Sequence, residues 1–161
     1  MEQITSGTMP EKMRSNLYII FSSCGVIYAL NYEYVCEIIP CMDTVLVNGA
    51  PEYIRGLINY GGEICPVISL CSISAKEPDN VSAKSCIIMI KSSGSGNALI
   101  GILAGSFLGS FGFSENDIKP VGSGDYSAAN GPLIGTAECP HGTAAVLSPG
   151  NFFKWMDWLE I

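Results

Sequence analysis

The sequence predicts an all-β protein made of two similar small β units and ending in a helix. Three observations predict this fold class. The apolar residues fall into short runs rich in β-branched and aromatic residues, glycine- and proline-containing turns separate these runs, and one pair of runs recurs at a constant offset of 79 residues. The chain of 161 residues has the size of a single domain.

The apolar runs define the expected elements in order. Residues 1–15 are polar and predict a loose tail, so the domain itself spans 16–161. The expected strands are 17–22, 26–30, 33–39, 53–59, 63–70, 85–91, 98–103, 107–113, 134–137 and 143–147. Residues 72–82 form a polar connector, and 114–131 form a turn-rich loop.

Two of these runs carry further detail. The first two strands lie close enough to form a hairpin around Cys24 and Gly25. Pro66, inside the run 63–70, predicts an edge strand or a bulge, because proline cannot donate to a β-ladder. In 33–39, alternation places Tyr34, Cys36 and Ile38 on one face and Val35, Glu37 and Ile39 on the other.

The internal repeat supports two β units. Ile54-Arg55-Gly56 and Val67-Ile68-Ser69 align with Leu133-Ile134-Gly135 and Val146-Leu147-Ser148 at the offset of 79 residues. In both places a small-residue turn separates a glycine-entered strand from a buried one.

The last residues differ from the rest of the chain. Phe152, Trp155, Met156 and Leu159 recur at helical spacing. Asn151 is a suitable cap, so we expect a terminal amphipathic helix that packs on the sheet.

Charge and hydropathy exclude one class of partner and favour another. Eight basic and fifteen acidic residues give a net charge of −7, which excludes a nucleic-acid ligand. Charged residues make up 14% of the chain, against about 25% in an ordinary soluble domain. This shortage predicts apolar surface left exposed for a protein partner.

The cysteines predict a reduced, intracellular protein. Their number is odd and no two form a C-x-x-C motif, which argues against a secreted disulfide scaffold. The N-terminus has no apolar signal core. Cys36, Cys65 and Cys86 lie in β-type runs and are expected to be buried. The seven are Cys24, Cys36, Cys41, Cys65, Cys71, Cys86 and Cys139.

A thiol enzyme built on Cys139 and His141 is one alternative to an interaction protein. A cysteine nucleophile needs an imidazole base, and His141 is the chain's single histidine. However, Pro140-His141-Gly142 is ordinary turn sequence. One histidine with unpaired cysteines also gives no zinc-ligand spacing, so no metal or cofactor is expected.

A membrane-associated protein is a second alternative. Residues 98–113 are apolar, and Gly101, Gly105 and Gly109 have the spacing of a transmembrane packing face. The segment is shorter than the roughly 20 residues needed to span a bilayer. We therefore expect two strands with a bend and no direct membrane insertion.

The central run resembles the CheW-like coupling domain of bacterial chemotaxis. The resemblance rests on Glu37-Ile38-Ile39 followed by residues 50–68 (APEYIRGLINYGGEICPVI) and covers about residues 16–155. It implies an all-β domain of two small five-stranded SH3-like barrels. It also implies a cytoplasmic adaptor without catalysis or cofactor, which binds chemoreceptor tips and the regulatory domain of the chemotaxis histidine kinase.

The chain departs from the family pattern at its polar positions. The family arginine is replaced by Gly61, and family aspartates are replaced by Ser69, Gly105 and Ser148. The resemblance implies that the glutamate of the E-I-I strand lies near the lost arginine. We therefore expect Glu37 to be exposed and unpaired, or else to bond to Arg55.

The matched run supplies the expected partner-binding residues. Gly56 and Asn59 are expected to act first through backbone geometry, and Tyr60 is the best candidate for an altered contact. Because the polar signature is changed, a diverged paralogue that binds a different protein stays open as an alternative. The full predicted set is Glu37, Ile39, Arg55, Gly56, Asn59, Tyr60 and Gly61.

Overall fold

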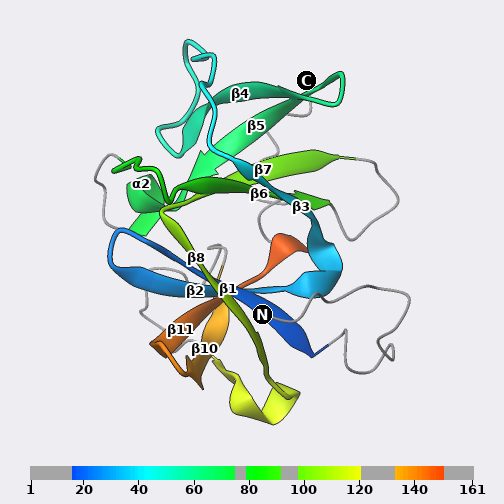
Figure 1. Ribbon diagram of the computed structural model, residues 1–161, viewed down its shortest axis with the longest axis vertical. Helices are drawn as coiled ribbons and strands as arrows, with labels where there is room; N and C mark the ends of the chain where they lie inside the picture. The colour runs from blue at the N-terminus through cyan, green and yellow to red at the C-terminus, as the bar shows by residue number, and fades with distance from the viewer. Residues whose placement is uncertain (1–15, 75–78, 92–97, 121–132, 151–161) are drawn as a thin grey trace.

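The computed structural model describes residues 16–74, 79–91, 98–120 and 133–150 (Figure 1). Over these ranges the protein consists of two β-sheets, which lie one above the other, with three short helical turns. The prediction of an all-β fold is confirmed. The predicted tail 1–15 and the predicted terminal helix beyond Gly150 lie outside the described residues.

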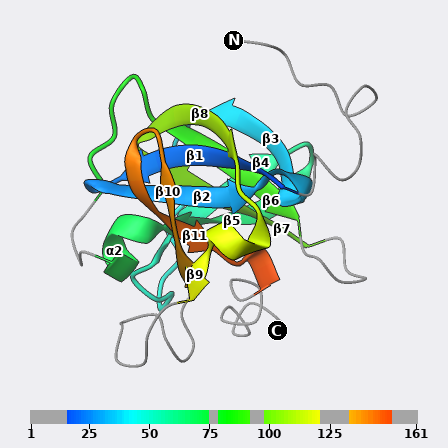
Figure 2. The ribbon, with the colours of Figure 1, turned by 90° about the horizontal axis from the view of Figure 1, so that it is seen from below.

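The first sheet, sheet A, has the strand order β8-β1-β2-β11-β10-β9. Its strands lie toward the viewer when the molecule is seen from below (Figure 2). The bounds are β1 (Leu17–Ser23), β2 (Val26–Asn31), β8 (Ser106–Gly112), β9 (Lys119–Pro120), β10 (Leu133–Cys139) and β11 (Gly142–Leu147).

The second sheet, sheet B, has the order β3-β6-β7-β5-β4. Its bounds are β3 (Val35–Pro40), β4 (Ile54–Tyr60), β5 (Glu63–Ser69), β6 (Cys86–Lys91) and β7 (Leu99–Ala104). The 3₁₀ turns η1 (Tyr32–Tyr34) and η2 (Glu115–Asp117) and the helix α2 (Leu70–Ser74) complete the described elements. Sheet A thus has six strands instead of five, because the loop predicted at 114–131 contains the two-residue strand β9.

The chain passes from sheet A to sheet B and back again. The hairpin β1–β2 belongs to sheet A, but the next strand, β3, pairs with β6 in sheet B. In the same way the hairpin β6–β7 belongs to sheet B, and the following β8 pairs with β1 in sheet A. Each half of the chain therefore contributes to both sheets, which ties the two units together.

The predicted repeat is confirmed at the level of register. In β4–β5, Ile54 faces Ile68 and Gly56 faces Val67, with a bulge between the two pairs. In β10–β11, Leu133 faces Leu147 and Gly135 faces Val146, again with a bulge. These pairs differ by the 79-residue offset. Each hairpin then pairs in parallel with a strand of its own sheet.

Several strands are buried on both faces, which explains much of the low charge content. In β6, Ile88 and Ile90 pack into a cluster between the sheets, while Ile87 and Met89 pack into a separate cluster of sheet B. A third cluster lies on the other face of sheet A. Apolar surface is exposed as well, as predicted, at Ile38, Met42, Val45, Leu46, Ile64, Val81 and Ile134.

Two strand predictions differ from the structure in detail. The strand expected at 33–39 begins at Val35, because Glu33 and Tyr34 lie in η1, and a bulge between Val35 and Glu37 interrupts its alternation. Pro66 does not lie on an edge strand, since β5 lies between β7 and β4. The alternative expectation, a bulge, fits better, because the register of β4 and β5 shifts between Ile54 and Gly56, beside the Leu57–Pro66 pair. Proline is tolerated there because the β7 pairing of β5 covers only Val67, Ile68 and Ser69.

The apolar segment 98–113 forms β7 and β8, two strands that turn at Gly105. Gly105 packs closely on the carbonyl oxygen of Ser22, which a Cβ at this position would approach to 3.1 Å. Among the described helices, none is long and apolar enough to cross a membrane.

The cysteine prediction was wrong in two respects: two cysteines are joined in a disulfide, and one cysteine that was expected to be buried is exposed. Cys24 and Cys71 form a disulfide between the β1–β2 turn and α2, so the described chain is not fully reduced. Cys65 and Cys86 are buried as expected, whereas Cys36 is exposed: it lies on the edge strand β3, in the bulge between Val35 and Glu37.

Candidate partner-binding site

The predicted partner residues meet where sheet B curls on itself. Glu37 lies on the edge strand β3, and Tyr60 ends β4, the opposite edge strand. The Tyr60 hydroxyl donates to Oε1 of Glu37 at 2.5 Å. This hydrogen bond raises the pKa of Tyr60 to about 12, with smaller contributions from desolvation and the Glu37 charge. The phenol is therefore neutral at physiological pH.

This contact replaces both arrangements expected for Glu37. The carboxylate is exposed, as predicted, but it is neither unpaired nor bonded to Arg55. The sequence offered no signal for the contact, because the two residues are 23 positions apart and only the curl of the sheet brings them together.

The β4–β5 turn has a backbone that suits glycine at position 61, where the family pattern has arginine. Gly61 and Gly62 both have positive φ, of 59° and 91°, in a two-residue connection between Tyr60 and Glu63. Such a turn strongly favours glycine. The Asn59 side chain accepts a hydrogen bond from the Gly62 amide at 2.9 Å, so its predicted role in holding the turn is confirmed.

Gly56 acts through close packing and an unusual backbone. Its φ is +151°. A Cβ at this position would lie 2.7 Å from Cβ of Thr44 and 2.8 Å from the carbonyl oxygen of Val45. The connection after β3 crosses β4 here, and Val45 forms a bridge with Leu57. Only glycine lets that segment close the edge of β4.

Ile39 and Arg55 are not free surface groups. Ile39 is 8% exposed and packs in the cluster of sheet B, so it supports the strand that carries Glu37. Arg55 Nη1 pairs with Asp79 Oδ2 at 3.2 Å. Sequence reasoning missed Asp79, because the pair is 24 residues apart and Asp79 lies within the predicted polar connector.

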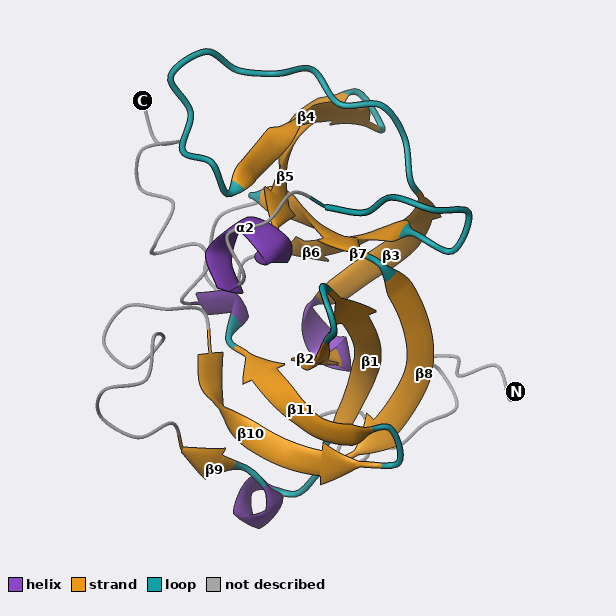
Figure 3. Ribbon diagram, turned by 90° about the vertical axis from the view of Figure 1, so that its left-hand side faces the viewer, coloured by secondary structure: helices purple, strands orange, loops and turns teal. Residues whose placement is uncertain are grey.

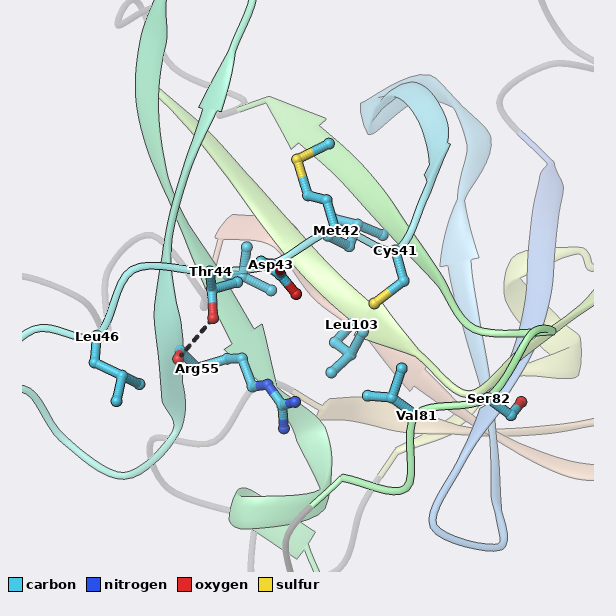
Figure 4. Close-up of a pocket in the computed structure, with 11 residues that line it drawn as sticks. Cys41, Met42, Asp43, Thr44, Leu46, Arg55, Val81, Ser82 and Leu103 are labelled. Carbon is cyan, nitrogen blue, oxygen red and sulfur yellow. Dashed lines mark hydrogen bonds between the residues drawn. The ribbon is translucent and has the colours of Figure 1, made fainter.

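Arg55 also lines an open groove of about 780 Å³. Figure 4 shows the guanidinium pointing across this groove toward Val81, while Thr44 donates to the Arg55 carbonyl oxygen at 3.3 Å. The floor is formed by the buried residues Val67, Ile87 and Leu103, and the rim carries both polar and apolar side chains. The groove is lined by Cys41, Met42, Asp43, Thr44, Leu46, Arg55, Val67, Val81, Ser82, Ile87 and Leu103.

Ser69, which stands at the position of a family aspartate, caps the N-terminus of helix α2. The Ser69 hydroxyl oxygen accepts a hydrogen bond from the Ser72 amide at 3.2 Å, at the start of α2. Serine and aspartate are both good N-cap residues, so this change preserves the helix start.

The Cys139–His141 pair forms ordinary turn structure. Cys139 ends β10, and Pro140 and His141 connect it to β11. The Cys139 side chain is half-buried against the cluster of sheet A, and His141 is exposed. Within the described ranges, no three metal-binding side chains gather in one place.

Comparisons with known proteins agree with this architecture. The CheW-like domain profile matches residues 17–154. A search of curated proteins returned no match. Among solved structures, the chain is similar to the crystal structure of the scaffolding protein TtCheW from Thermoanaerobacter tengcongensis. The TM-score is 0.73 at 21% identity, over 91% of this chain and 90% of that one.

The structural match shows the fold, that of two SH3-like subdomains, and the profile match covers most of both sheets. The protein therefore belongs to the CheW-like domain family, a family of non-catalytic scaffolds in chemotaxis signalling.

Proposed function

We propose that this protein is a cytoplasmic adaptor that couples the cytoplasmic tips of chemoreceptors to the regulatory domain of the chemotaxis histidine kinase. It would act as a single domain over residues 16–161, without a cofactor. The observation that supports this most directly is that most of the predicted partner residues gather around one feature, the tip of the β4–β5 hairpin and the adjoining edge of β3.

In this proposal the residues divide by task. Glu37 and Tyr60 present polar groups to the partner, and Asn59 and Gly61 shape the turn beside them. The remaining predicted residues hold these groups in place: Gly56 and Ile39 by packing, and Arg55 through its ion pair.

A second candidate is a diverged paralogue that serves a different protein partner. The observation that favours it is the chemistry of the Glu37–Tyr60 contact. A neutral phenol supplies one donor where the family arginine supplies five and a positive charge. A partner that requires the guanidinium would not bind this surface.

Substitution of Tyr60 tests the proposed surface. Tyr60→Ala should weaken binding to the kinase regulatory domain by about tenfold or more, since buried interface aromatics contribute strongly to affinity. The matched control is Thr143→Ala, which removes a similar exposed hydroxyl–carboxylate bond to Glu138 in the sister hairpin. Unchanged affinity in a folded Tyr60→Ala protein would remove Tyr60 from the site.

A further inference from the structure

The Cys24–Cys71 disulfide joins the two sheets. Cys24 lies in the turn between β1 and β2 of sheet A, and Cys71 lies in α2, directly after β5 of sheet B. Their Cα atoms are 5.5 Å apart, a spacing typical of protein disulfides. Figure 3 shows α2 beside the junction of the two sheets.

The backbone at Cys24 indicates that this residue is present for its sulfur. Cys24 has a φ of +52°, and it is the one non-glycine residue in the described ranges with a positive φ. Gly25 follows with a φ of +76°. Two-residue hairpin turns of this kind favour Asn-Gly, Asp-Gly or Gly-Gly, so backbone geometry alone does not favour cysteine here.

The two sulfurs differ in access. Cys24 is half-buried, whereas Cys71 is 3% exposed. A small cavity of about 60 Å³ lies against both and is also lined by Asp79, Val81 and Gly105. An external thiol or disulfide therefore reaches Cys24 first, and Cys71 acts as the inner partner.

The disulfide lies beside a non-covalent joint between the sheets. The Gly105 amide donates to the Ser22 carbonyl oxygen at 2.8 Å, and the Ser23 hydroxyl donates to the Leu103 carbonyl oxygen at 3.2 Å. Neither bond involves a sulfur atom, so neither depends directly on the disulfide. The disulfide adds a covalent restraint beside these hydrogen bonds.

The same region forms one wall of the groove around Arg55. Val81 lines both the small cavity at the disulfide and the groove. Asp79, also beside the disulfide, holds Arg55 across the groove. Residues 79–82 therefore lie between the disulfide and the groove. Formation or loss of the disulfide at Cys71 acts on the groove through this short segment.

We propose that Cys24 and Cys71 form a reversible redox site that restrains the wall of the groove at residues 79–82. In closure, the Cys24 thiolate attacks a small-molecule disulfide and releases one thiol. The Cys71 thiolate then attacks the Cys24 sulfur of the mixed disulfide and releases the second thiol, which takes the second proton. The two cysteines lose two electrons and the small disulfide gains them; a thiol reductant reverses both exchanges.

The test uses the full-length protein equilibrated with oxidised or reduced glutathione. Cysteine alkylation followed by peptide mass spectrometry should find Cys24 and Cys71 joined in oxidised buffer and both alkylated in reduced buffer, with full return on re-oxidation. Cys24→Ser should abolish the linkage. The control Cys139→Ser should behave as the wild type, because that cysteine is free and far along the chain.

Amide hydrogen exchange tests the link to the groove. Reduction should speed exchange at residues 79–85 by about tenfold and leave the β10–β11 hairpin unchanged, and Cys24→Ser should show the fast rate in both buffers. The proposal is overturned if no Cys24–Cys71 linkage forms in oxidised buffer or if the linkage resists reduction. It is also overturned if residues 79–85 exchange equally fast in both states.

Discussion

Replacing Gly56 by alanine should destabilise the protein strongly, because two independent penalties meet at this position. The backbone φ of +151° is one that L-residues rarely adopt, and holding alanine there costs about 1–3 kcal/mol. The new methyl group would also lie 2.7 Å from Thr44 Cβ and 2.8 Å from the Val45 carbonyl oxygen. Overpacking of this kind costs about 1–3 kcal/mol.

The two penalties together predict a loss of about 4 kcal/mol in the free energy of unfolding. For a domain of this size the melting temperature falls by about 2–4 °C per kcal/mol, so Gly56→Ala should melt about 8–16 °C below the wild type. Urea denaturation followed by circular dichroism measures the free energy, and a thermal scan measures the shift.

Alanine substitutions at two other glycines separate the backbone penalty from the steric penalty. Gly61 has a φ of +59° and open space around its Cβ position, so Gly61→Ala should cost only about 1–2 kcal/mol from the backbone. At Gly135, the repeat equivalent of Gly56, a Cβ would collide with the Lys119 carbonyl oxygen, so Gly135→Ala should report the steric penalty. The reasoning is refuted if Gly56→Ala is no more destabilising than Gly61→Ala.

Two further predictions concern the contacts around the partner surface. Because the hydrogen bond to Glu37 raises the pKa of Tyr60 to about 12, this contact should stabilise the fold up to about pH 10, the usual tyrosine pKa, and be lost as pH rises further toward 12. Glu37→Ala, which removes the acceptor, should return the Tyr60 pKa toward 10. A tyrosinate absorbance titration in the alkaline range that matches the wild type would contradict this. Asp79→Asn should lower the unfolding free energy by about 1 kcal/mol, since Arg55 is partly exposed and screened; a urea titration that shows no loss at low salt would exclude a stabilising ion pair.

Local sequence signals predicted most of the fold. β-branched runs between glycine turns located nearly all the strands, and the offset repeat predicted two related hairpins. The bulge that both hairpins share at Gly56 and Gly135 was not predicted. The strand predictions succeed because hydrophobic period and turn chemistry are encoded by neighbouring residues. Pro66 could not show whether β5 lies at an edge, because strand order is set by distant segments.

The candidate site was predicted in its members but not in its contacts. Asn59 and Gly56 follow from backbone requirements that sequence shows directly. The bond between Glu37 and Tyr60, and that between Arg55 and Asp79, depend on how sheet B curls and on where the chain returns after α2. The Cys24–Cys71 linkage was missed for the same reason, since 47 residues separate the pair and an odd cysteine count suggested free thiols.

Binding to the two proposed partners tests the central claim most directly. The full-length protein would be titrated, by isothermal calorimetry, with the regulatory domain of its host's chemotaxis kinase and separately with a receptor-tip fragment. The adaptor proposal predicts micromolar affinity for both, which corresponds to about −8 kcal/mol. Absence of binding to both, from a protein whose circular dichroism and melting show it to be folded, would contradict the proposal.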